Sequence, residues 1–142
     1  MSFDPGQWAE KQAKDWMDGQ SNKVSSFVYH RYPDAKAARG ALSAQPADYL
    51  VSTQGRILHL EIKETKELNR LPKAKVRQYG MLQKWWWGNV APYVVVYRSV
   101  AKDWTYLSSA ELFGFDECPA SFDMTSQPKF STAADVLSHL FA

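Results

Sequence analysis

The feature that most constrains the fold of this chain is a pair of strand-like runs separated by a short turn. Residues 49–53 and 56–63 are rich in aliphatic and β-branched side chains, and Gln54-Gly55 lies between them. This pattern predicts a β-hairpin. Side chains alternate between the two faces of a strand. One face of the second strand therefore carries Leu58, Leu60 and Ile62, which we expect in the core, and the other carries Ile57, His59, Glu61 and Lys63.

The length of the turn sets the register of the hairpin. With a two-residue turn Thr53 faces Arg56, and the same register places Asp48 opposite Glu61, with Cβ atoms ~5 Å apart. Carboxylates in such positions repel one another unless a cation neutralises them. Oxygen ligands suit Mg²⁺ or Mn²⁺. A three-residue loop would shift the pairing by one residue and weaken this interpretation.

Lys63 completes the polar set on this strand. It lies two residues beyond Glu61 and on the same face. An ammonium group in that position can orient or help to deprotonate an attacking water, and it can stabilise negative charge in a transition state at phosphorus. The pattern thus favours metal-assisted hydrolysis of a phosphodiester.

The other expected elements follow from periodicity and from stop signals. We expect helices over residues 5–19, with Asp4 as cap and Gly19 as end, over 73–87, over a short segment ending at Phe113, and over a last segment that opens at Ser131. We expect strands over 27–32, 93–97 and 104–107. We expect residues 34–47 to form a loop or a short helix and residues 114–130 to form irregular surface. The order α-β-β-β-α-β-β-α predicts a mixed sheet flanked by helices.

Composition supports one folded domain over residues 1–142. About 45% of the residues are hydrophobic and 14% aromatic, which is enough for a core. Cys118 is the single cysteine, so an intrachain disulfide and a thiolate zinc site are excluded, and a reducing compartment is expected. No apolar run reaches the ~20 residues of a membrane helix, and the N-terminal residues lack a signal-peptide pattern. We therefore expect a cytoplasmic protein that does not bind membranes.

The charge of the chain is unevenly distributed. The net charge is +2 overall, but residues 1–100 carry a net +6 and residues 101–142 a net −4. Five basic residues and no acidic one occur between positions 68 and 84. A basic patch beside a few carboxylates suits a polyanion such as DNA. The alternative interpretation of these basic residues is a solvent-exposed helix face that keeps the protein in solution.

Two short strings carry a family resemblance over roughly residues 6–98. Pro46-Ala47-Asp48 followed by Glu61-Ile62-Lys63 resembles the signature of the PD-(D/E)XK nucleases, with Ala47 inserted where the signature has Pro-Asp. The continuation Glu64-Thr65-Lys66, together with Leu71-Pro72 and Gln78, is similar to the RecU-type Holliday junction resolvases. The resemblance implies an α/β fold with a mixed central sheet flanked by helices, as in restriction endonucleases.

The same resemblance implies roles for individual residues. Asp48, Glu61 and the Ile62 carbonyl would be metal ligands, and Lys63 the catalytic lysine. Many members place a glutamate of the first helix near the metal, and Glu10 is the candidate, with an ordinary solvent-facing glutamate as the alternative. The candidate DNA-binding residues are Lys36, Arg39, Lys66, Arg70, Lys73, Lys75, Arg77 and Gln78.

The activity implied is that of a Mg²⁺-dependent endodeoxyribonuclease, with Mn²⁺ as a possible substitute. The expected substrate is four-way or otherwise branched DNA, cut by a homodimer of phage or bacterial origin. Three alternatives stay open: an exonuclease or a flap or single-strand nuclease of the same superfamily, a non-catalytic DNA-binding module, and a protein-interaction domain.

Trp85-Trp86-Trp87 is unusual within the segment 73–87. Successive helical residues point about 100° apart, so the three indoles cannot share one face. We expect one or two of them in the core and at least one exposed. An exposed indole could stack on an unpaired base or form a dimer contact.

Overall fold

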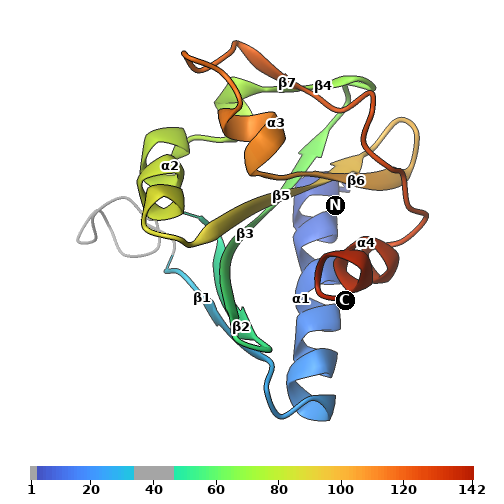
Figure 1. Cartoon of the computed structure of the whole chain (residues 1–142). Helices are drawn as coiled ribbons and strands as arrows, with labels where there is room; N and C mark the ends of the chain where they lie inside the picture. The colour runs from blue at the N-terminus through green and yellow to red at the C-terminus, as the bar shows by residue number, and fades with distance from the viewer. Residues whose placement is uncertain (1–2, 34–46) are drawn as a thin grey trace.

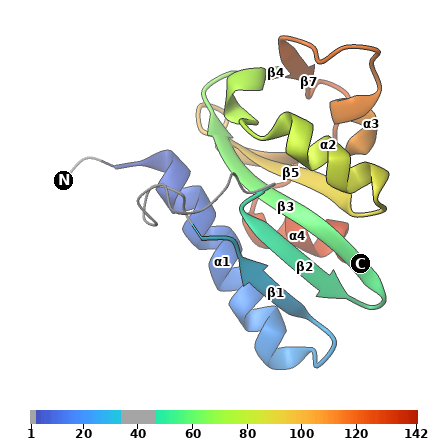
Figure 2. The same ribbon diagram turned by 90° about the vertical axis from the view of Figure 1, so that its left-hand side faces the viewer.

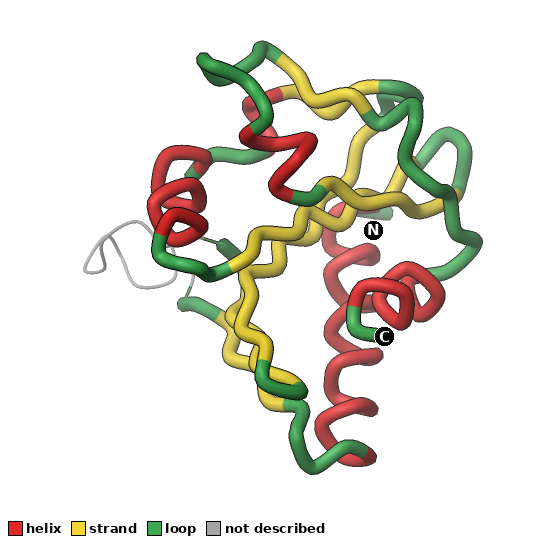
Figure 3. Tube along the Cα trace, in the orientation of Figure 1, coloured by secondary structure: helices red, strands yellow, loops and turns green. Residues whose placement is uncertain are grey.

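A computed structural model describes residues 3–33 and 47–142 of the chain. Figure 3 shows the helices, strands and loops along this length. The elements are α1 (Pro5–Lys23), β1 (Val28–Arg31), β2 (Tyr49–Thr53), β3 (Arg56–Thr65), β4 (Arg70–Pro72), η1 (Lys73–Lys75), α2 (Tyr79–Trp87), β5 (Ala91–Arg98), β6 (Asp103–Leu107), α3 (Ser109–Phe113), β7 (Ser121–Asp123) and α4 (Ala133–Leu140).

Five strands form a mixed sheet in the order β1-β2-β3-β5-β6. The pair β3–β5 is parallel, and the other three pairs are antiparallel. Helices α1 and α4 lie on one side of this sheet, and α2 and α3 on the other (Figure 1). Strands β4 and β7 pair separately. The predicted fold class, a mixed sheet flanked by helices, is confirmed.

The β2–β3 hairpin has the predicted register. The pairs run from Thr53↔Arg56 to Tyr49↔Leu60. Gln54 and Gly55 both have positive φ, 50° and 76°, as a two-residue hairpin turn of the primed type requires. Asp48 is the residue directly before β2, and it continues the register toward Glu61.

A hydrophobic core lies on each face of the sheet. The first core joins α1 and α4 to the strands, and it contains Leu58, Leu60 and Ile62 as predicted. The second core lies under α2 and α3 and contains Val94 and Val96. Glu61 pairs with Val94 and Lys63 with Val96 in the parallel ladder, so this polar face of β3 borders the second core.

Three predictions about these elements are wrong. Helix α1 does not end at Gly19 but continues to Lys23. A helical glycine costs only about 1 kcal/mol, and the turn after Gly19 is closed by a hydrogen bond from the Val24 N–H to the Gln20 carbonyl at 2.8 Å, with Val24 packed against the first core. The chain leaves the helix at Val24, whose backbone is extended.

The helix expected over 73–87 begins only at Tyr79. The Lys73 N–H donates to the Ala120 carbonyl, and Val76 is buried with a non-helical backbone. Tertiary pairing thus takes the backbone groups that a helix would need. For the same reason residues 114–130 are not wholly irregular, because β7 pairs with β4 there. No helix within residues 3–33 and 47–142 is long and apolar enough to cross a membrane.

Candidate active site

The end of the hairpin places Asp48 against β3. The Tyr32 N–H donates to the Asp48 carbonyl at 2.9 Å, and the Ile62 N–H donates to Asp48 Oδ2 at 3.0 Å. The main chain of Asp48 is therefore held by the end of β1 and its carboxylate by β3. Tyr32, Asp48 and Glu61 consequently form a row across three neighbouring strands, since facing residues in a sheet share one side.

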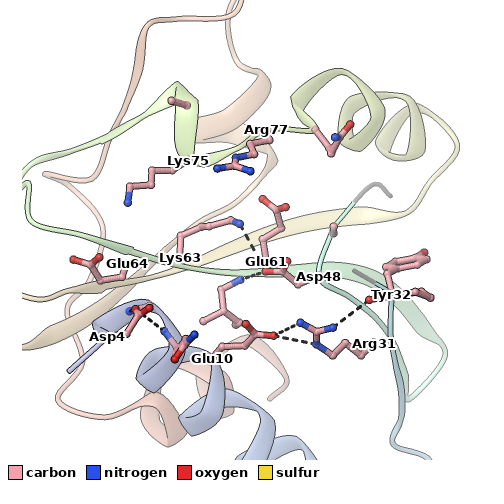
Figure 4. A pocket seen from close by; sticks show the side chains of 17 residues that line it. Asp4, Glu10, Arg31, Tyr32, Asp48, Glu61, Lys63, Glu64, Lys75 and Arg77 are labelled. Carbon is pink, nitrogen blue, oxygen red and sulfur yellow. Dashed lines mark hydrogen bonds and ion pairs between the residues drawn. The ribbon is translucent and has the colours of Figure 1, made fainter. Parts of the chain in front are cut away.

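This row opens into a cavity of about 590 Å³. Its wall is formed by the start of α1, the end of β1, the middle of β3 and the segment before α2. Figure 4 shows Glu10 and Arg31 on one side of Asp48 and Glu61, and Lys75 and Arg77 on the other. Cations and further carboxylates surround the central pair, namely Arg31, Lys63, Lys75, Arg77, Asp4, Glu10 and Glu64. Two carboxylates beside cations suit a phosphodiester bound beside a metal ion.

Glu61 has an unusual environment for a carboxylate. The residue is only 5% exposed, and its Oε2 has no hydrogen-bond partner among the described residues. Burial is the main reason that its pKa is raised to about 7, with a further contribution from the charge of Asp48, while Lys63 acts in the opposite direction. Burying a carboxylate oxygen without a hydrogen-bond partner destabilises the folded state unless a bound ligand contacts that oxygen.

Lys63 links the two carboxylates electrostatically. Its Nζ lies 3.9 Å from Asp48 Oδ2, and both side chains are about one quarter exposed at 23% and 28%. Burial raises the pKa of Asp48, and the charge of Lys63 and the hydrogen bond from Ile62 lower it. The charge of Lys63 is thus the largest influence that lowers the pKa of each of the two acids.

The donor atoms of this site fit a divalent cation. The described residues contain no group of three or more His, Cys, Asp or Glu side chains that could hold a metal. Mg²⁺, however, is commonly bound through one or two carboxylates and retains several waters. Asp48 and Glu61 supply two carboxylates, and the Ile62 carbonyl is the third expected ligand. The unpartnered Glu61 Oε2 is the observation that favours such a ligand set.

Glu10 reaches the same cavity, but its carboxylate has partners of its own. Glu10 Oε1 accepts from Arg31 Nη2 at 2.8 Å and from Arg31 Nε at 3.0 Å. It also accepts from the Tyr49 hydroxyl at 3.1 Å. The negative charge of Glu10 nevertheless acts on Asp48, whose pKa it helps to raise. Glu10 is therefore near the centre of the site, in an ion pair with Arg31.

The candidate DNA-binding residues divide into three groups. Lys75, Arg77 and Gln78 line the cavity, although Gln78 precedes α2 instead of lying on it. Lys66, Arg70 and Lys73 are exposed but lie outside the cavity lining, and Arg70 donates to Ser121. Lys36 and Arg39 lie outside the described residues.

Arg31 and Tyr32 are cavity residues that the sequence analysis did not single out. Both belong to the run 27–32 that was expected to be a strand. The signal that could have found them is Pro33, which ends this strand just where the antiparallel register with β2 brings its last residues beside Asp48. That register could not be derived, because the two strands are joined by a long segment instead of a tight turn.

Comparison with solved structures identifies the architecture. One similar structure is that of Hjc, a Holliday junction resolvase from the archaeal hyperthermophile Archaeoglobus fulgidus. The alignment covers 89% of this chain and 98% of that one, with a TM-score of 0.54 and 18% sequence identity. This chain has the resolvase fold. No protein-family model and no curated protein sequence matches it, so the likeness rests on three-dimensional structure alone.

Proposed function

We propose that this protein is a metal-dependent DNA endonuclease that hydrolyses phosphodiester bonds in branched DNA, with the Holliday junction as its preferred substrate. The observation that carries the proposal is the convergence of Asp48, Glu61 and Lys63 in one open cavity of a chain with the resolvase fold. The fold alone would be compatible with other activities, but a binding module has no use for two adjacent carboxylates beside a phosphate.

Asp48, Glu61 and the Ile62 carbonyl would hold Mg²⁺, with Mn²⁺ as a substitute. A bound divalent ion polarises the phosphoryl oxygen and lowers the pKa of a coordinated water. Lys63 extends into the cavity beside Asp48 (Figure 4), where its ammonium group can orient the attacking water and stabilise the charge that develops on the phosphate. Lys75 and Arg77 line the same cavity and would hold the neighbouring phosphates. We assign Glu10 to the site as a charged neighbour of Asp48. The RecU-type resemblance and the homodimer stay predictions.

Lys75 and Lys73 offer a matched test of the phosphate contacts. Both are exposed residues of η1, but only Lys75 lines the cavity. We expect Lys75→Ala to weaken DNA binding and to reduce the slope of log affinity against log salt by about 1, the value for one lost phosphate contact. Lys73→Ala should change that slope much less. Equal effects of both variants would contradict the placement of the substrate in this cavity.

Cleavage of a synthetic four-way junction, a linear duplex and a single strand tests the function directly. Mg²⁺ and EDTA are compared for the wild type and for Asp48→Asn. Asparagine keeps an oxygen for the Ile62 N–H, so the fold should be retained. Nicking of the junction alone, dependent on Mg²⁺ and lost in the variant, supports the proposal. Cutting of all three substrates would leave a nuclease without junction preference. Binding without cleavage under Mg²⁺ or Mn²⁺ would reject catalysis.

A further inference from the structure

Four aromatic side chains form a row that runs from β1 across one face of the sheet to α2 and passes beside the active site. The ring centroids are 5.7 Å apart between His30 and Tyr32, 5.6 Å between Tyr32 and His59, and 5.0 Å between His59 and Trp85. Tyr32 lines the catalytic cavity. We refer to His30, Tyr32, His59 and Trp85 as the aromatic row. None of these residues has a role in the hydrolysis described above.

The register of the sheet places the aromatic row directly beside the catalytic carboxylates. His30 faces Leu50, and Leu50 faces His59. His59 lies two residues before Glu61 on β3, so it projects to the same side of the sheet at a distance of roughly 6.6 Å along the strand. Figure 2 shows β1, β2 and β3 side by side in this region, with α2 beyond β3. A nucleotide next to the scissile phosphate is therefore within reach of the row.

The centre of the aromatic row is buried and hydrogen-bonded. His59 is completely buried, with its Nε2 2.8 Å from the Tyr32 hydroxyl and its ring edge-on to Trp85. Its Nδ1 has no hydrogen-bond partner among the described residues. The imidazole thus holds the Tyr32 ring at the cavity wall through its hydrogen bond and packs edge-on against the Trp85 ring. Trp85 itself remains 40% exposed.

Of the elements that carry the aromatic row, β3 alone contains acidic residues, and these are Glu61 and Glu64, which follow His59 in the chain. Strand β1, strand β2, helix α2 and residues 56–60 of β3 contain no Asp or Glu. One exposed cation accompanies the rings, because Lys84 adjoins Trp85. Arg31 adjoins Tyr32 in the chain but is ion-paired with Glu10. The exposed rings of the row are His30 and Trp85. Exposed aromatic rings near cations are the pattern of surfaces that bind single-stranded nucleic acid through base stacking.

We propose that the aromatic row binds an unstacked nucleobase next to the scissile phosphate, with Trp85 as the stacking platform and His59 as the residue that positions it. The substrate would therefore carry unstacked nucleotides beside the cut, as a branch point or a gap supplies, because a base inside a continuous duplex offers no free face to an indole. This inference rests on the proposed nuclease function and specifies the class of DNA that the site accepts.

The test compares binding to a blunt duplex and to the same duplex with a short single-stranded gap, by fluorescence anisotropy in EDTA. The variants are Trp85→Leu, which keeps apolar volume without a ring, and Trp85→Phe, which restores a ring. Trp87→Leu is the matched control, since Trp87 is 66% exposed and lies two residues further along the same helix, about 200° around its axis.

We expect Trp85→Leu to weaken binding to gapped DNA by at least about fivefold, the lower limit for one stacked base, and to leave duplex binding unchanged. Trp85→Phe should restore most of the loss, and Trp87→Leu should behave as wild type. Equal losses for both DNA forms, or equal losses for Trp85→Leu and Trp87→Leu, would overturn the proposal.

A measurement on the wild-type protein keeps the proposal testable if Trp85→Leu fails to fold. With 2-aminopurine in the gap, stacking on Trp85 should quench its fluorescence on binding, and a signal that stays unchanged would overturn the proposal. Sedimentation equilibrium tests whether a second copy of this chain binds to the aromatic row instead of a nucleobase. If the wild type is a dimer and Trp85→Leu dissociates it, the row is a contact between two copies and the proposal is overturned. Wild-type cleavage combined with unaltered binding by Trp85→Leu would reject this inference and leave the nuclease function standing.

Discussion

Replacement of Lys63 by methionine is expected to lower the rate of DNA cleavage by about a thousandfold, the range for loss of a group that transfers protons or stabilises transition-state charge. Methionine keeps the length and the apolar stem of the side chain and removes its ammonium group. That group lies 3.9 Å from Asp48 Oδ2, on the strand that also carries Glu61. Single-turnover rates with saturating enzyme measure the chemical step apart from binding.

The loss of Lys63 should also change the pH dependence of cleavage. The charge of Lys63 opposes the effect of burial on both Asp48 and Glu61. Without it the pKa of each carboxyl group rises further, so the acidic limb of the pH–rate profile should move to higher pH. A purely structural role for the lysine would leave the position of this limb unchanged.

Lys66→Met is the matched control for Lys63→Met. Lys66 follows three residues later in the chain, is exposed, and lies outside the cavity lining. Its replacement should affect DNA binding at most and leave the single-turnover rate within a few fold of wild type. If Lys63→Met retained more than a tenth of the wild-type rate, Lys63 would not be the catalytic lysine.

The hairpin could be predicted from sequence because its information is local. Alternation along β3 separates Leu58, Leu60 and Ile62 from Glu61, and a two-residue turn with Gly55 determines which residue faces Asp48. The burial of Glu61 was not predictable in the same way. It depends on Val94 of β5, which pairs with Glu61, and on the second core above that strand. Parallel pairing of strands far apart in sequence leaves no local pattern.

The cations of the site illustrate the same limit. Lys75 and Arg77 were expected on a helix. A run of basic residues on a helix predicts contact with DNA but does not show where the DNA lies relative to the active site. They lie instead on η1 and on the segment before α2, because β4 pairs with β7 and directs the chain across the cavity. The pairing partner, residues 121–123, is about fifty positions away. The sequence therefore predicted the charge of this surface but not its position opposite Glu61.

Glu61→Gln is expected to abolish cleavage and, without a metal, to stabilise the protein at alkaline pH. Burial raises the pKa of Glu61 from 4.5 to about 7, so the folded state binds this proton more tightly than the unfolded chain does. The contribution of Glu61 to stability is therefore fully present below about pH 4.5 and is lost as the pH rises through 7. At pH 8 the wild-type protein buries an ionised carboxylate with one unpartnered oxygen.

Glutamine has nearly the same shape and no charge, so the variant avoids this cost. A change of one in pKa corresponds to about 1.4 kcal/mol. Because the amide also leaves polar atoms with incomplete hydrogen bonding, we expect a net gain on the order of 2 kcal/mol at pH 8. For a chain of this size that raises Tm by about 6 °C. At pH 5 the two proteins should melt at similar temperatures, since Glu61 is then protonated in the folded state.

The buried His59 titrates in an overlapping range, and the comparison removes its effect. Burial lowers the pKa of His59 from 6.5 to about 4, so its neutral form favours folding above pH 6.5 and this contribution is lost as the pH falls toward 4. Wild type and Glu61→Gln share His59, and the difference between their melting curves at each pH therefore isolates Glu61. A variant less stable than wild type at pH 8 would show that Glu61 is a structural acid. A variant that is more stable but inactive would show that the buried Glu61 carboxylate destabilises the fold and is required for catalysis.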